Sequence, residues 1–201
     1  MRKYNARRMS DQCIMTTTAL LIIDMQNDFV GPDAPLRVSG ADEILGSVRA
    51  VLDDFRSKDL PVIHILRIHR PGGSDVEHFR REIFAKIPFA VAGTRGAQVI
   101  PSLTPLPGEH ILAKTRMSGF IGTDLDLLLR SLGVERIVVV GIQTPNCIRT
   151  TVFDAMAYGY DTLLISDATA AATPEIHQAN IRDMAAIGVS ILTTEECRQR
   201  I

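Results

Sequence analysis

Arg136-Ile137-Val138-Val139-Val140, followed directly by Gly141-Ile142-Gln143-Thr144-Pro145-Asn146-Cys147, is the stretch that decides how this chain folds. Its first half is an apolar, β-rich run of the kind found in buried strands of parallel sheets. Residues 148–156 then carry apolar side chains at helical spacing, so Cys147 stands where a strand gives way to a helix. The unpaired N–H groups and the dipole of a helix N-terminus stabilise a thiolate. Cys147 is therefore a candidate nucleophile as well as a candidate core residue.

The rest of the chain repeats this alternation of strand and helix. Near-continuous apolar runs indicate a sheet covered on both faces, and alternating strands and helices indicate parallel strands with right-handed crossovers. We predict an α/β fold, a Rossmann-like three-layer α-β-α sandwich whose mostly parallel six-stranded sheet has the order 3-2-1-4-5-6. The expected strands are Ala19–Ile23, Val62–Ile68, His110–Ala113, Arg136–Val140, Thr162–Ser166 and Val189–Leu192, and helices are expected around residues 44–55, 125–132, 148–156 and 176–187.

Composition limits the possible partners. The 201 residues, 46% of them hydrophobic, suffice for one domain, which we place at residues 17–201. A net charge of −1 favours a small-molecule substrate and argues against nucleic-acid or membrane binding. Three well-separated cysteines without a CxxC pair favour a reducing compartment. Residues 1–16 hold no apolar stretch of signal-peptide length, so we expect a flexible N-terminal tail and a cytoplasmic protein.

The interval from His69 to Gly108 breaks the regular pattern. It contains Pro71-Gly72-Gly73-Ser74, a charged stretch at Glu77–Glu82, and the glycines of Gly93–Gly96. Long irregular connections in compact domains are usually lids or interface segments. We therefore expect this connection to contribute to the site or to a homo-oligomer contact.

Three chemically useful residues follow or end predicted strands. Asp24 ends the first strand, Lys114 ends the third, and Cys147 follows the fourth. Ligands of open α/β sheets bind at the carboxyl ends of strands, so these side chains should meet at one edge. There Asp24 could take the thiol proton while Lys114 stabilises both charges. Taken singly, the aspartate could instead be a turn residue and the lysine a solvated one.

Three motifs now stand in order along the chain: Leu20-Leu21-Ile22-Ile23-Asp24-Met25-Gln26-Asn27-Asp28-Phe29, Lys114-Thr115-Arg116-Met117-Ser118-Gly119-Phe120 and Gly141–Cys147. From about Thr18 to Thr194 the chain resembles the isochorismatase-like cysteine hydrolases. These include nicotinamidases, carbamoylsarcosine and ureidoacrylate amidohydrolases, biuret hydrolases and the isochorismatases proper.

The resemblance implies a mechanism. Asp24, Lys114 and Cys147 would form a catalytic triad in which the thiol attacks an amide carbonyl and gives a thioester that water hydrolyses. A cis peptide bond would join Ile142 and Gln143, and the backbone N–H groups of Gln143 and Cys147 would form the oxyanion hole. Isochorismatases proper generally lack the cysteine, so its presence favours C–N bond hydrolysis. The resemblance also implies assembly as a dimer or tetramer.

No cofactor or metal is expected. The resemblance places an Asp-x-His metal pair of nicotinamidases at Arg67-Ile68-His69, and an arginine cannot ligate a metal. A metal-assisted nicotinamidase-like hydrolase using His69 and His78 remains an alternative, as does a ligand-binding or redox-sensing module built around Cys147.

The motifs also suggest the lining of a substrate pocket. We expect Phe29 and Phe120 to flank a planar amide, although both could be core residues, and Gln143 to contact the substrate. Arg116 is the first candidate for a substrate carboxylate, and Arg149 an alternative that could instead face solvent or a partner subunit. Further candidates in and around the long connection are Arg67, Arg70, Arg80 and Arg81, each of which could simply be solvated.

Overall fold

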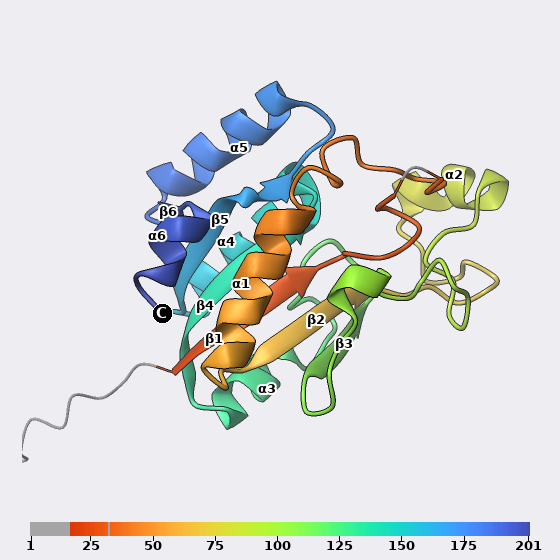
Figure 1. Cartoon of the computed structure of the whole chain (residues 1–201). Helices are drawn as coiled ribbons and strands as arrows, with labels where there is room; N and C mark the ends of the chain where they lie inside the picture. The colour runs from red at the N-terminus through yellow and green to blue at the C-terminus, as the bar shows by residue number, and fades with distance from the viewer. Residues whose placement is uncertain (1–16, 32) are drawn as a thin grey trace, which may run out of the picture.

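A computed structural model describes residues 17–31 and 33–201, so the expected tail at residues 1–16 lies outside the described residues. Six parallel strands form one sheet in the order β3-β2-β1-β4-β5-β6 (Figure 1), which confirms the predicted order. No helix in the described part of the chain is long and apolar enough to cross a membrane. The strands are β1 (Thr17–Ile23), β2 (Val62–Arg67), β3 (His110–Lys114), β4 (Val134–Ile142), β5 (Asp161–Ala170) and β6 (Ser190–Leu192).

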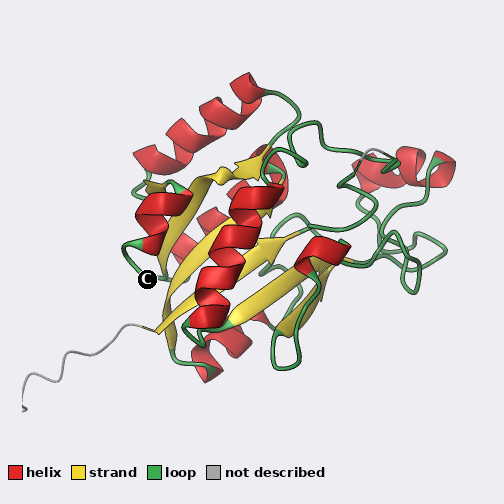
Figure 2. Cartoon of the chain, in the orientation of Figure 1, coloured by secondary structure: helices red, strands yellow, loops and turns green. Residues whose placement is uncertain are grey.

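Helices cover both faces of the sheet (Figure 2). Successive residues of β1 point to opposite faces: Leu20 and Ile22 pack in the core beneath α1 and α6, and Leu21 and Ile23 pack in the core beneath α3, α4 and α5. Burial on both faces is the reason why the strands read as unbroken apolar runs. The helices are α1 (Leu45–Ser57), α2 (Arg81–Lys86), α3 (Leu125–Ser131), α4 (Arg149–Ala157), α5 (Pro174–Ala186) and α6 (Thr194–Arg198).

The junction after β4 differs from the simple strand-to-helix change that we predicted. A π-helical turn, η3 (Thr144–Ile148), precedes α4, and Cys147 lies within this turn. Upstream, Gly141 has a φ of +110°, and a Cβ atom at this position would lie 2.2 Å from the carbonyl oxygen of Ile23. Glycine is therefore required where β4 passes closest to β1.

The long connection between β2 and β3 is packed against the carboxyl edge of the sheet. It holds two 3-10 turns, η1 (His78–Arg80) and η2 (Pro101–Leu103), with α2 directly after η1. Asp28, in the loop after β1, accepts a hydrogen bond from the Ala90 N–H at 2.7 Å, and this bond ties the two loops together. Figure 1 shows α2 beyond the ends of β1 and β2, and η1 leads into that helix.

Candidate active site

The strand ends bring the three predicted catalytic side chains together. Asp24 follows β1, Lys114 is the last residue of β3, and Cys147 lies in the turn after β4. Lys114 Nζ donates a hydrogen bond to Asp24 Oδ2 at 2.8 Å, and all three residues are buried. Because β2 separates β3 from β1, only a long side chain at position 114 can reach the aspartate.

The thiol of Cys147 is held in its protonated form. Burial raises its pKa, the negative charge of Asp24 raises it further, and the positive charges of Lys114 and Arg67 only partly oppose this. We expected the helix N-terminus to favour a thiolate, but desolvation in this buried turn outweighs that contribution. Asp24 Oδ1 is buried and has no hydrogen-bond partner among the described residues.

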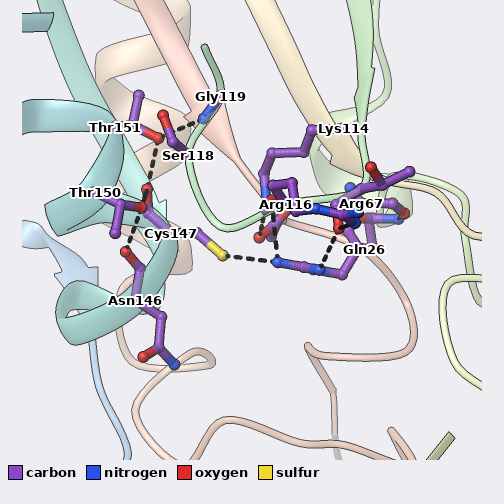
Figure 3. Close-up of polar contacts among 12 residues, drawn as sticks. Gln26, Arg67, Lys114, Arg116, Ser118, Gly119, Asn146, Cys147, Thr150 and Thr151 are labelled. Carbon is purple, nitrogen blue, oxygen red and sulfur yellow. Dashed lines mark hydrogen bonds and ion pairs between the residues drawn. The ribbon is translucent and has the colours of Figure 1, made fainter. Parts of the chain in front are cut away.

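Arg67, the last residue of β2, points into the same site (Figure 3). Its side chain is 1% exposed, and its Nη2 lies 3.5 Å from the sulfur of Cys147. Nη1 donates to Glu77 at 2.8 Å and Nη2 to the Arg116 carbonyl at 3.2 Å, so the guanidinium is held from several sides. Of the two fates that we considered for this arginine, solvation is therefore excluded.

His69 and His78, the residues of the metal-assisted alternative, have different surroundings. His69 is fully buried, its ring is packed edge-on against Phe84 and Phe89, and burial lowers its pKa. His78 is exposed at the start of η1. Within residues 17–31 and 33–201, no group of three His, Cys, Asp or Glu side chains is arranged to hold a metal. At the position that the resemblance gives to the nicotinamidase metal ligands, Arg67 stands in place of the aspartate. Its guanidinium is cationic and has no acceptor, so these residues do not form a metal-binding site.

A small cavity of about 40 Å³ opens beside the thiol. Four residues that we predicted for the site line it, namely Asp24, Phe29, Gln143 and Cys147. The peptide bond between Ile142 and Gln143 is cis, as the resemblance implied. The other lining residues are Arg67 and Arg80, two of the arginine candidates, together with Ile142 and with Val38 and Asn146, to which the sequence gave no role.

Two predicted substrate-binding residues lie elsewhere. The buried ring of Phe120 is stacked on the buried Tyr160 and on the exposed Tyr158, and it does not line the cavity. The guanidinium of Arg116 is directed to the carbonyl of Asp75 at 2.7 Å, on the exposed side of the loop after β3. Position in a motif therefore placed the backbones of Phe120 and Arg116 near the site but did not determine the direction of their side chains.

The remaining arginine candidates divide in the same way. Arg149 pairs with Asp183 of α5 at 2.8 Å, which agrees with the surface alternative. Arg70 and Arg81 are exposed. Only Arg67 and Arg80 reach the cavity, and Arg80 does so from η1 of the long connection.

A larger hollow of about 230 Å³ lies at the carboxyl end of β5. It is lined largely by alanine and other small residues of 169–174, with Glu43 and His177 as its titratable groups. The His177 ring is hydrogen-bonded to Thr144 at 2.9 Å. Ser39, Thr169 and Thr173 bring hydroxyl groups to this hollow, but no cysteine lines it, so the thiol chemistry belongs to the smaller cavity.

A parallel α/β sheet with a buried thiol beside a lysine–aspartate pair at its carboxyl edge has the architecture of a cysteine hydrolase. Residues 18–196 match the family model of the isochorismatase domain, and the chain therefore belongs to the isochorismatase family.

Relatives and solved structures agree with this assignment. The chain is 44% identical to a protein of Arabidopsis thaliana named "probable inactive nicotinamidase", with 92% of this chain and 96% of that protein covered. It is 30% identical to the ureidoacrylate amidohydrolase RutB of Caulobacter segnis, over 81% of this chain and 76% of that enzyme.

Among solved structures, an isochorismatase family protein of Desulfovibrio vulgaris superimposes with a TM-score of 0.89 at 43% identity, with 92% of this chain and 98% of that chain covered. A cysteine hydrolase of Pseudomonas syringae superimposes with a TM-score of 0.85 at 29% identity, with 92% of each chain covered. The fold and the family are thus established from both sequence and structure.

Proposed function

We propose that this protein is a cysteine hydrolase that cleaves a C–N bond of a small amide, ureide or carbamoyl compound. The observation that carries the proposal is the buried Cys147 thiol beside Asp24, whose Oδ1 has no partner among the described residues while Oδ2 is held by Lys114. A protonated thiol needs a base, and we assign that role to this carboxylate oxygen.

The reaction then proceeds in two halves. Asp24 accepts the thiol proton, and the sulfur of Cys147 attacks the carbonyl carbon to give a tetrahedral intermediate. The oxyanion is held by the backbone N–H groups of Gln143 and Cys147, and the C–N bond breaks as Asp24 returns the proton to the departing nitrogen. Water, deprotonated by Asp24, attacks the thioester, and the acid and the thiol are released with the proton restored to sulfur.

Lys114 and Arg67 provide fixed positive charge during these steps. Lys114 orients Asp24 through the 2.8 Å bond, and Arg67 lies 3.5 Å from the sulfur on which negative charge develops. Buried cations at such distances stabilise the thiolate that Asp24 creates. The Arabidopsis relative is named a probable inactive nicotinamidase. In this chain, Arg67 at the position that the resemblance gives to a metal ligand favours an amide other than nicotinamide.

Replacement of Cys147 by serine tests the proposal. Ammonia release should be measured for the wild type, Cys147→Ser and the control Cys197→Ser, over a panel of small amides, ureides and carbamoyl compounds. Cys197 is also a buried free thiol, but it lies in α6 away from the cavity. Loss of the nucleophile should lower turnover by roughly 10³-fold or more, since the residues of such a unit act together.

Two outcomes would count against the proposal: no compound of the panel is hydrolysed, or Cys147→Ser retains the wild-type rate. Full activity after exhaustive chelation would exclude the metal-assisted alternative. A redox-sensing module would oxidise reversibly at Cys147 without hydrolysing any amide. Assembly as a dimer or tetramer, and residence in the reducing cytoplasm, stay predictions alongside this function.

A further inference from the structure

Arg80 is the cation in the cavity whose guanidinium has no hydrogen-bond acceptor among the described residues. It ends η1, is half-buried and lines the cavity with Cys147. Its guanidinium donates no hydrogen bond to any residue of 17–31 or 33–201, and its one ring contact is with the adjacent Phe79, 5.2 Å from the ring centre. A guanidinium has five donors, so this side chain brings unused binding capacity to the site.

The other charges of the site are paired. Lys114 is bonded to Asp24, and Arg67 is bonded to Glu77, each at 2.8 Å. Two carboxylates therefore face three cations, and the excess positive charge belongs to Arg80. Burial and the nearby charge of Arg67 lower the pKa of Arg80, yet an arginine stays protonated at neutral pH. A bound anion would relieve this uncompensated charge.

Arg67 cannot take this role itself. Its Nη1 donates to Glu77 and to the Thr115 carbonyl at 3.3 Å, and its Nη2 donates to the Arg116 carbonyl and faces the thiol. The terminal N–H groups of Arg67 are thus committed, whereas those of Arg80 have no acceptor in the part of the chain that the structure describes. The two arginines therefore have separate tasks. Arg67 contacts the sulfur of Cys147, and Arg80 faces the cavity in which a substrate would lie beside that sulfur.

We propose that the substrate carries a carboxylate and that Arg80 binds this carboxylate while Cys147 attacks the amide or carbamoyl carbon. This inference rests on the proposed function and narrows it to small amides or carbamoyl compounds that also bear a carboxylate. A planar guanidinium matches a carboxylate with two parallel hydrogen bonds. A cavity of about 40 Å³, room for only a few water molecules as it stands, requires that the carboxylate and the scissile bond be a few bonds apart.

Alkylation of Cys147 tests this without any turnover. Iodoacetate and iodoacetamide have nearly the same shape, and only the first carries a carboxylate. Labelling of Cys147 should be followed by peptide mass spectrometry in the wild type, Arg80→Gln, Arg80→Lys and Arg81→Gln. Arg81 is the exposed neighbour in sequence and serves as the matched control.

We expect Arg80→Gln to lower the iodoacetate rate about tenfold, the value of one charge-assisted hydrogen bond, with the iodoacetamide rate changed less than about twofold. Arg80→Lys should recover part of the iodoacetate rate, and Arg81→Gln should leave both rates unchanged. Equal changes with the two reagents, or no change with either, would overturn the assignment. Circular dichroism identifies any variant that fails to fold. If Arg80→Gln does not fold, the ratio of the iodoacetate and iodoacetamide rates in Arg80→Lys decides whether the assignment holds.

A binding measurement separates this inference from the proposed function. Calorimetry on Cys147→Ser should show N-carbamoylglycine binding about tenfold more tightly than its neutral amide, with the preference lost when Arg80→Gln is added. A preference below about twofold would refute the carboxylate site even if amides are hydrolysed. If the wild type hydrolyses no compound of the panel but Cys147→Ser still prefers the carboxylate, the hydrolase proposal is refuted and the carboxylate site is supported.

Discussion

The two oxygens of Asp24 have different surroundings, and this difference defines the site. Oδ2 accepts the Lys114 hydrogen bond, whereas Oδ1 is buried without a partner among the described residues. A buried carboxylate oxygen without a donor is costly in a folded protein. The pKa of the neighbouring Cys147 thiol is raised, so the thiol holds its proton. The unpaired Oδ1 is explained if this oxygen receives the thiol proton during the reaction.

Asp24→Asn should separate the two effects of this carboxylate. Loss of its negative charge lowers the pKa of Cys147, because the positive charges of Lys114 and Arg67 are then opposed by burial alone. The pH midpoint of Cys147 alkylation by iodoacetamide should therefore fall by about one unit or more. Amide turnover should nevertheless drop by roughly 10²- to 10⁴-fold, since no base remains to carry the proton.

The control for this variant is Asp53→Asn, which removes an exposed carboxylate that is paired with Arg49 on α1. Neither the alkylation profile nor turnover should change there. An alkylation midpoint that stays in place or rises in Asp24→Asn would show that the aspartate is not coupled to the thiol.

The sequence located Asp24, Lys114 and Cys147 because each one is fixed by a strand end, and parallel strands share an edge. Arg80 could only be one candidate among several, since its position depends on how a long irregular connection folds back over the sheet. Arg67 was more accessible to inference. As the final residue of the strand between β1 and β3, it had to lie at the same edge.

At the scale of elements, the contact between β1 and β4 sets the distance between Asp24 and Cys147. These central strands pair in parallel from Thr17 to Ile23, and Gly141 lies opposite Ile23. Close backbone approach at the glycine joins the ends from which the base and the nucleophile emerge.

Gly141→Ala should strongly disturb this contact. A methyl group at this position would lie 2.2 Å from the Ile23 oxygen, in a residue with a φ of +110°. We expect a loss in the free energy of unfolding on the order of 4 kcal/mol, from overpacking and backbone strain together. Amide turnover should fall by more than the loss of folded protein explains, since the two strand ends are pushed apart.

Urea denaturation measures this effect, with Gly46→Ala as the matched control. A Cβ atom at Gly46 meets nothing within 4 Å, and this residue lies in α1. Alanine there should raise stability by about 0.5 to 1 kcal/mol. Similar values for the two variants would show that the β1–β4 approach is not restrictive.

Element boundaries mark the limit of pattern reading. Burial of the sheet on both faces made its strands visible, and helical spacing identified α1, α3, α4 and α5 to within a few residues. The π-helical turn at Cys147 was not visible, because a wider turn of this kind leaves no apolar period. The short helix α2 was missed because Phe84 is its only buried residue, which gives no repeat to detect.

At the scale of the whole molecule, Glu109 connects three elements at the edge opposite the catalytic one. It precedes β3, accepts Arg56 Nε of α1 at 2.6 Å, and contacts His64 Nε2 of β2 at 2.9 Å. Burial alone would raise the pKa of Glu109, but hydrogen bonds from Arg56, from the Leu106 N–H and from His64 lower it to about 2. The folded state therefore prefers the ionised carboxylate.

Glu109→Gln should lower stability in a pH-dependent way. A carboxylate whose pKa falls from 4.5 to about 2 on folding contributes fully above pH 4.5, and the contribution is lost as the pH falls toward 2. At pH 7 we expect the variant to lose roughly 1.5 to 3 kcal/mol, typical of a hydrogen-bonded charge. Urea denaturation between pH 7 and pH 2 should show the difference from wild type shrinking across this window.

Glu82→Gln, which breaks only an exposed pair with Lys86, should change stability by less than about 0.5 kcal/mol throughout. A loss in Glu109→Gln that is the same at every pH would mean that shape, and not charge, holds α1, β2 and β3 together at this edge.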